Sequence, residues 1–117
     1  MKKGLDEMAH EDGRYDPAAF RFVYEGLDYT VKHVTQEARH VSGQTLCEGL
    51  RQMAIEKYGR LALLVLNTWG LKTTRDFGEI VYILIDHEWM SAQPTDSIDD
   101  FNDVYDFQAA FKGQFAF

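Results

Sequence analysis

Histidine and carboxylate side chains are the residues of this chain that could bind a metal ion or transfer protons. Of the four histidines, only His87 lies between two acids, in Asp86-His87-Glu88. Consecutive residues on a helix point about 100° apart, so these three side chains cannot converge on one ion. No histidine has the His-Glu-x-x-His spacing of a zinc site. The pattern is typical of a solvated helix end, and we predict no metal site and no cofactor.

A series of aspartates near the C-terminus could bind calcium, because hard cations prefer several carboxylate oxygens. The series consists of Asp96, Asp99, Asp100, Asp103 and Asp106. Its spacing does not match the EF-hand loop, which needs acids at alternate positions, a glycine and a later glutamate. On a helix the first four would instead share one face. We interpret them as an acidic surface that faces solvent or a partner.

Covalent catalysis needs an activated nucleophile, and the sequence supports none. The single cysteine, Cys47, lies in an apolar helical pattern with no histidine beside it, which is typical of a small core residue. His40 and Ser42 could form a polar pair, but Ser42 already has a sufficient role as a helix N-cap. We therefore predict no catalytic residues and no enzyme. A small enzyme whose histidine and carboxylate site is assembled only by the fold is the third alternative.

The charge of this 117-residue chain is −7 and is unevenly distributed. Residues 1–75 hold eleven Lys/Arg and ten Asp/Glu, whereas residues 76–117 hold only Lys112 against nine acids. This imbalance disfavours nucleic acid, because Lys and Arg drive binding to phosphates, and it favours a basic partner. A single cysteine, no apolar signal segment and no membrane-length apolar run predict a cytoplasmic protein without membrane contact.

The apolar run Leu61–Leu66 is expected to be the helix around which the chain packs. It has no polar residue for six positions, and Gly70 follows where a left-handed helix end is common. We expect Leu64 and Leu66 to be buried.

Two amphipathic helices are predicted before this run. Asp16-Pro17 favours a helix start, because aspartate is a good N-cap and proline is tolerated at the first helical position. Gly26 inside that helix indicates a close helix crossing, since glycine otherwise costs about 1 kcal/mol there. Ser42 is a second N-cap, for a helix that ends at Gly59.

A further helix is predicted after Thr73-Thr74, which offers two N-caps. Its apolar surface is wider than one stripe requires, because Ile83, Ile85 and Trp89 lie beside the inner stripe. Such a helix is buried on more than one side or contributes to an interface, so self-association is one alternative.

The C-terminal third leaves two alternatives open. Asp106 favours a short helix, whereas a short strand near Tyr105 would give a β-wing. In a winged-helix fold, residues 61–69 and 74–88 would be the helix pair and residues 89–107 the wing. We predict a mainly α protein, a compact bundle of four to five helices with or without that wing. Residues 1–14 are expected to be a mobile arm outside a single domain of residues 15–117.

Several spaced motifs carry a resemblance to a known family. They are Arg14-Tyr15-Asp16-Pro17, Arg39-His40-Val41-Ser42-Gly43-Gln44, Trp69-Gly70, Asp76-Phe77-Gly78-Glu79-Ile80-Val81 and Tyr105-Asp106-Phe107. Over about residues 14–111 the chain resembles a family of short uncharacterised bacterial proteins, known chiefly from Planctomycetes and Verrucomicrobia. The family has no assigned activity, so the resemblance transfers no functional residue.

The sequence therefore favours a non-catalytic protein-interaction or regulatory module with an acidic, aromatic C-terminal surface. Its partner would be a protein with a basic surface or a second copy of the chain. The residues predicted to bind it are Trp89, Asp99, Asp100, Asp103, Tyr105 and Phe107. The alternative is a winged-helix-like regulator that contacts nucleic acid through Arg60, Lys72 and Arg75.

Overall fold

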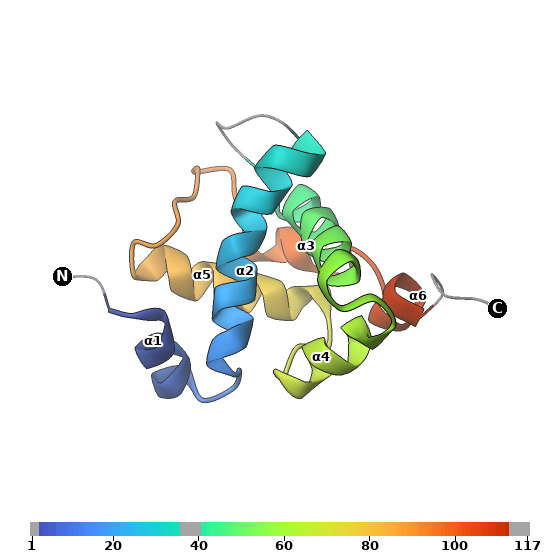
Figure 1. Cartoon of the computed structure of the whole chain (residues 1–117). Coiled ribbons are helices and arrows are strands. Elements are labelled where there is room, and N and C mark those ends of the chain that lie inside the picture. Colours follow the sequence, from blue (N-terminus) through green and yellow to red (C-terminus); the bar gives the residue numbers. More distant parts are fainter. Residues whose placement is uncertain (1–2, 36–40, 113–117) are drawn as a thin grey trace.

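Helices make up the regular structure of the chain, which is described here by a computed structural model over residues 3–35 and 41–112. The elements are α1 (Leu5–Asp12), α2 (Pro17–Thr30), the π-helical turn η1 (Val31–Thr35), α3 (Gly43–Tyr58), the 3-10 turn η2 (Gly59–Leu61), α4 (Ala62–Thr68), α5 (Thr74–Asp86), the 3-10 turn η3 (Ile98–Phe101) and α6 (Phe107–Lys112). Figure 1 shows α2 lying across α5, with α3 beside it. The predicted mainly α fold is confirmed.

The starts of α2 and α3 follow their predicted caps. The Asp16 carboxylate accepts a hydrogen bond from the Ala18 N–H at 2.9 Å, and Pro17 is the first helical residue. The Ser42 hydroxyl accepts from the Thr45 N–H at 3.1 Å. Each cap satisfies an N–H group that has no partner within the helix.

Two glycines bring α2 and α3 close together. A Cβ atom on Gly26 of α2 would lie 2.1 Å from Leu50 Cδ2, and one on Gly49 of α3 would lie 1.8 Å from Thr30 Oγ1. Any larger residue would therefore overlap the facing helix, which confirms the close crossing predicted at Gly26. The Thr30 hydroxyl is buried at this crossing and donates to the Gly26 carbonyl at 2.6 Å.

The prediction of an arm over residues 1–14 is wrong for the described residues. Leu5–Asp12 form α1, and Met8 and Ala9 are buried in the common core. The Arg21 side chain of α2 also pairs with Asp6. The helix was not predicted because only Met8 and Ala9 are buried and Leu5 is partly buried against the core, which gives too short an apolar stripe to recognise in a polar sequence.

Helix α4 is less buried than its apolar sequence suggests. Leu66 is fully buried, but Leu64 is 63% exposed and Leu61 is 59% exposed, so the prediction of a buried Leu64 is wrong. A helix on the outside of the domain buries one face only, and Leu61 and Leu64, three residues apart, share the outer face. Gly70 ends the segment with a φ of +95°, as predicted.

Helix α5 is held at its start by the N-terminal segment. The Asp76 carboxylate accepts from the backbone N–H groups of Lys72 and Thr73, at 2.8 and 3.0 Å. It also accepts from the Tyr15 hydroxyl at 2.6 Å. A Cβ on Gly70 would lie 2.7 Å from the Arg14 carbonyl oxygen. The motifs that begin at Arg14, Trp69 and Asp76 therefore contact one another at the start of α5.

The apolar side chains of α5 outside its inner stripe pack within the domain. Its inner stripe of Phe77, Ile80, Val81 and Leu84 is buried, as predicted. Ile83, Ile85 and Trp89 are half-buried and pack against the same core. The breadth of this face therefore gives no separate argument for self-association.

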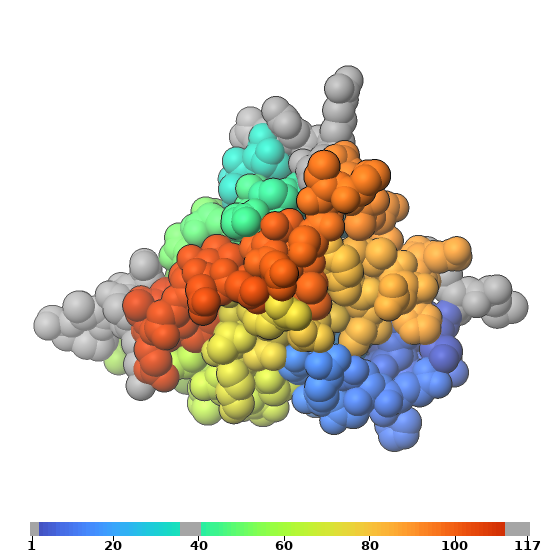
Figure 2. Space-filling view, turned by 180° about the vertical axis from the view of Figure 1, so that it is seen from behind, coloured from blue at the N-terminus to red at the C-terminus, as the bar shows by residue number. Residues whose placement is uncertain are grey.

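No strand occurs in residues 89–107, so this segment does not form a β-wing. Its regular part is η3, whose Phe101 packs onto α5 where a Cβ on Gly78 would lie 2.7 Å from the Phe101 Cγ. The Thr74 hydroxyl donates to the Phe101 carbonyl at 2.6 Å. Figure 2 shows the segment, orange to red, running across the back of the molecule to α6, the short helix predicted from Asp106.

Candidate binding groove

A groove along α2 and η1 is the candidate site. Its volume of about 660 Å³ lies in the range of small-molecule and peptide sites. We call it the α2 groove, and it is lined by Tyr24, Glu25, Leu27, Asp28, Tyr29, Val31, Lys32, His33, Met53, Lys57 and Trp89. Of the predicted partner-binding residues, only Trp89 lines it.

The groove has an aromatic corner formed by Tyr24 and Trp89. Their ring centroids are 5.2 Å apart and their planes are perpendicular. Trp89 follows α5, and its indole N–H donates to the Lys3 carbonyl at 2.7 Å, which fixes the ring. Tyr24 is one of the three large hydrophobic side chains that the described residues expose. The fold therefore holds the Trp89 ring in place, whereas the Tyr24 ring is partly open to solvent.

A second aromatic pair lies further along the groove. The rings of Tyr29 and His33 are 4.4 Å apart, and His33 belongs to the π-helical turn η1. The Tyr29 hydroxyl donates to the Glu56 carboxylate at 2.6 Å, and this hydrogen bond raises the pKa of Tyr29. π-Helical turns occur often at functional sites, so the presence of η1 favours this surface as the candidate site.

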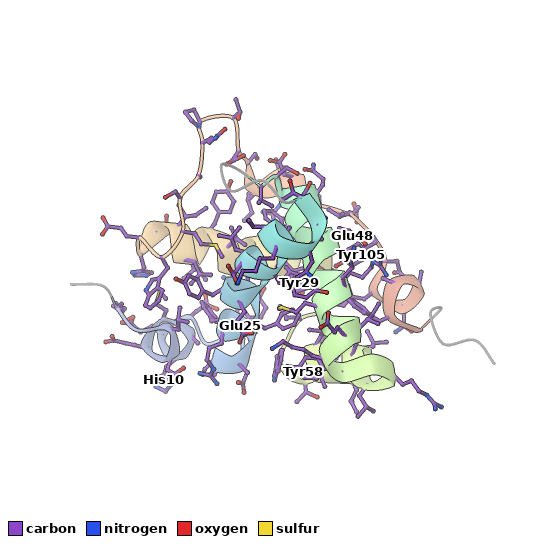
Figure 3. All side chains as sticks on the ribbon, turned by 45° about the horizontal axis from the view of Figure 1, so that its top comes forward. His10, Glu25, Tyr29, Glu48, Tyr58 and Tyr105 are labelled. Atoms are coloured by element: carbon purple, nitrogen blue, oxygen red, sulfur yellow. The ribbon has the colours of Figure 1, made fainter. Side chains whose placement is uncertain are left out.

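Two ion pairs line the rim of the groove. Lys57 of α3 donates to Glu25 of α2 at 2.9 Å, and Lys32 pairs with Asp28 at 2.9 Å. Figure 3 shows Glu25 and Tyr29 between α2 and α3, where the glycine crossing brings the helices together. All four charged side chains are substantially exposed, so each pair contributes little stability and exchanges partners readily.

Two exposed acids precede Trp89 in the chain, Asp86 by three positions and Glu88 by one. Neither makes an ion pair with any residue in 3–35 or 41–112, whereas lysines balance the two acids in the groove.

The predicted aspartates of the C-terminal third have structural partners. Asp99 is exposed and pairs with Arg75 of α5 at 3.0 Å. Asp100 is half-buried and accepts from the Ser97 N–H at 3.1 Å, which caps η3. Asp103 is exposed and adopts a φ of +50°. Asp99 and Asp103 thus face solvent, while Asp100 mainly holds the turn.

Phe107 and Tyr105 of the predicted C-terminal surface are used in packing against the core. Phe107 is buried, with its ring 5.4 Å from the ring of Phe77. The Tyr105 hydroxyl donates to the Cys47 carbonyl at 2.7 Å, and burial raises the pKa of Tyr105 well above its usual value. Both residues anchor the segment to the core, so neither forms part of an open partner surface, although Tyr105 is only partly buried.

The three basic residues of the nucleic-acid alternative do not form an open patch. Arg75 pairs with Glu79 at 2.9 Å as well as with Asp99. Lys72 is exposed but lines a hollow with Asp103 and Asp106. Arg60 lies on η2, so Arg60 and Lys72 flank opposite ends of α4. The acidic side chains next to Arg75 and Lys72 disfavour binding of a nucleic-acid phosphate backbone here.

The residues considered for chemistry stay apart. Within residues 3–35 and 41–112, no three His, Cys, Asp or Glu side chains are placed to hold one metal ion. Cys47 is buried, and burial raises the pKa of its thiol to about 12. His40 lies outside the described residues, so its pairing with Ser42 is not described. No helix in the described part of the chain is long and apolar enough to cross a membrane.

Sequence reasoning missed Tyr24 and Tyr29 as site residues. Tyr24 lies off the apolar stripe of α2, and an aromatic residue outside the stripe is the signal that could have found it. Its partner Trp89 is distant along the chain, and only the packing of α2 near the end of α5 brings the two rings together.

Comparison with known proteins finds no matching family model, curated protein or solved structure. The resemblance to the bacterial family thus stays a prediction. The functional argument depends on the α2 groove and its surrounding charge.

Proposed function

We propose that the protein is a non-catalytic interaction module that binds a basic segment of a partner protein in the α2 groove. The observation that carries the proposal is the aromatic pair of Tyr24 and Trp89 in the groove, close in the chain to Asp86 and Glu88, two exposed acids that make no ion pair within residues 3–35 and 41–112. Aromatic anchors held by the fold lose little entropy on binding, which is why such residues dominate protein interfaces. The single cysteine favours a cytoplasmic setting for this activity.

The acidic C-terminal turn has a secondary part in the proposal. Asp99 and Asp103 face solvent, so they attract a basic partner over long range without forming its pocket. Such charges change the association rate and its salt dependence more than the lifetime of the complex.

The experiment is selection of short peptides from a random library by the immobilised protein. We expect the selected peptides to be enriched in Lys and Arg beside an apolar residue, and salt to reduce their capture because exposed charges are screened beyond about 10 Å at 0.1 M. Tyr24→Leu should reduce this enrichment strongly. Tyr24 is 38% exposed and lies outside the buried core, so the substitution changes the groove more than the core.

A matched control is the triple substitution of Asp99, Asp100 and Asp103 by Asn. It should slow association but keep the same peptide preference, because the turn does not line the groove. Selected peptides without enrichment in Lys and Arg would refute the proposal. An enrichment that is unchanged in the Tyr24→Leu variant would refute it as well. Circular dichroism of each variant checks that the fold is retained.

Self-association is a second candidate, favoured by the exposed leucines of η2 and α4. Leu61 and Leu64 lie on one outer face and are the most exposed large hydrophobic side chains among the described residues. A second copy could pack its own α4 against this face. Light scattering up to hundreds of micromolar should then show a dimer that is lost on Leu61→Ser with Leu64→Ser. A constant monomer mass would exclude this candidate.

A further inference from the structure

We infer that the hollow at the start of α5 binds a free basic amino acid, such as lysine or arginine. The hollow has a volume of about 300 Å³ and is lined by residues 72–74, Asp103, Tyr105, Asp106 and Phe107. This volume is at the lower end of the range of small-molecule sites. No residue is shared with the lining of the α2 groove, so the inference does not depend on the proposed function.

The charged side chains of the hollow have no ion pair within residues 3–35 and 41–112. Lys72 is exposed and pairs with no carboxylate there, whereas every other Lys or Arg with a described side chain has an ion pair or another contact. Asp103 and Asp106 are also exposed and pair with no cation of the same ranges. The hollow therefore offers one positive and two negative groups to a ligand.

Hydrogen bonds fix the backbone on both sides of the hollow. The Lys72 N–H donates to the Asp76 carboxylate at 2.8 Å. The buried Thr74 hydroxyl accepts from the Val104 N–H at 3.2 Å, which holds the chain next to Asp103. A ligand therefore has to order only the charged side chains and not the backbone that carries them, which keeps the entropy cost of binding small.

A basic amino acid carries the complementary set of charges. Its carboxylate can pair with Lys72, and its two positive groups can pair with Asp103 and Asp106. One oxygen of Asp106 accepts from the Ala109 N–H at 3.0 Å, which leaves the other oxygen for the ligand. An acidic amino acid would instead bring two carboxylates to a hollow that already has two, and a simple amine would leave Lys72 without a partner.

The test is a chemical-shift titration of the full chain at constant ionic strength with L-lysine and with three analogues that each lack one charge. Cadaverine lacks the carboxylate, Nα-acetyl-L-lysine lacks the α-ammonium group, and L-norleucine lacks the side-chain ammonium group. We expect the amide shifts to centre on Lys72 and Asp103. Each analogue should bind about two- to fivefold more weakly than lysine, which corresponds to the loss of one exposed ion pair.

The variant Lys72→Gln identifies the group that recognises the carboxylate. It should bind lysine and cadaverine equally, because the carboxylate has then lost its partner. Lys32→Gln is the matched control, since Lys32 is exposed and pairs with Asp28 outside the hollow, and it should keep the preference for lysine. Both side chains are exposed, and circular dichroism checks that each variant is folded.

The native protein would overturn the inference by binding cadaverine as tightly as lysine, or by showing no shifts with lysine. A preference for lysine over cadaverine that survives Lys72→Gln would also overturn it. Equal binding of Nα-acetyl-L-lysine and lysine would exclude a free amino acid, because the acetylated form represents the C-terminal residue of a peptide. Equal binding of L-norleucine and lysine would exclude the selection of a basic side chain.

Discussion

Replacing Gly49 by alanine should destabilise the protein, although alanine is the better helix former. The new Cβ would lie 1.8 Å from Thr30 Oγ1 and 2.7 Å from Thr30 Cβ. The Thr30 side chain is fully buried, so it has no free space into which to move. Overpacking of this kind costs about 3 kcal/mol at the upper end of its usual range. The gain in helix propensity is about 1 kcal/mol.

The net loss is therefore about 2 kcal/mol, which corresponds to a fall in Tm of roughly 8 °C for a domain of this size. Urea denaturation followed by circular dichroism measures it. Adding Thr30→Ala removes two of the clashing atoms, so the double variant should lose at least about 1 kcal/mol less than the sum of the single variants.

Gly4→Ala is the matched control, because nothing lies within 4 Å of a Cβ at Gly4. Gly4 is the N-cap of α1, where alanine is a poorer cap than glycine, so the variant should lose no more than about 1 kcal/mol, from capping and not from overlap. A stabilising Gly49→Ala, or additivity with Thr30→Ala, would refute the close crossing of α2 and α3 and with it the construction of the groove.

Further predictions concern the core and its ionisable groups. Leu66→Ala should cost about 2–5 kcal/mol, whereas Leu64→Ala, on the exposed face of α4, should stay within about 0.5 kcal/mol in the same denaturation assay. Equal effects would show that α4 is packed differently. Burial raises the pKa of Cys47 from 9.0 to about 12, so the folded state keeps a proton that the unfolded state releases. This contribution to stability is complete below pH 9.0 and is lost as the pH rises to about 12. Burial raises the pKa of Tyr105 as well, so urea midpoints should fall across this alkaline range, and a midpoint independent of pH would contradict the burial of both groups. Iodoacetamide at neutral pH should modify Cys47 only after unfolding, as mass spectrometry can show, and rapid modification of the native protein would count against its burial.

The sequence predicted the helices well where local signals determine them. Ser42 and Asp16-Pro17 mark helix starts through hydrogen bonds to residues two or three positions away, so tertiary packing does not enter. Leu64 was misplaced because periodicity cannot show which face of an apolar helix meets the core. That depends on where α4 lies relative to the rest of the domain.

The candidate site was predicted only at Trp89. An acidic turn with interleaved aromatics is compatible with either an exposed or an internal position for those rings, and the Tyr105 hydrogen bond to the Cys47 carbonyl decides for the interior. The aromatic corner depends on a contact between residues far apart in the chain, and no local pattern specifies it.

The most direct test of the α2 groove is an amide and indole chemical-shift map of the protein during titration with a selected basic peptide. We predict that the largest shifts occur at Tyr24, Leu27 and the Trp89 indole N–H, with small shifts at Asp99 and Asp103. Shifts confined to that acidic turn or to α4, with the Trp89 indole unmoved, would contradict the assignment of the groove as the binding site.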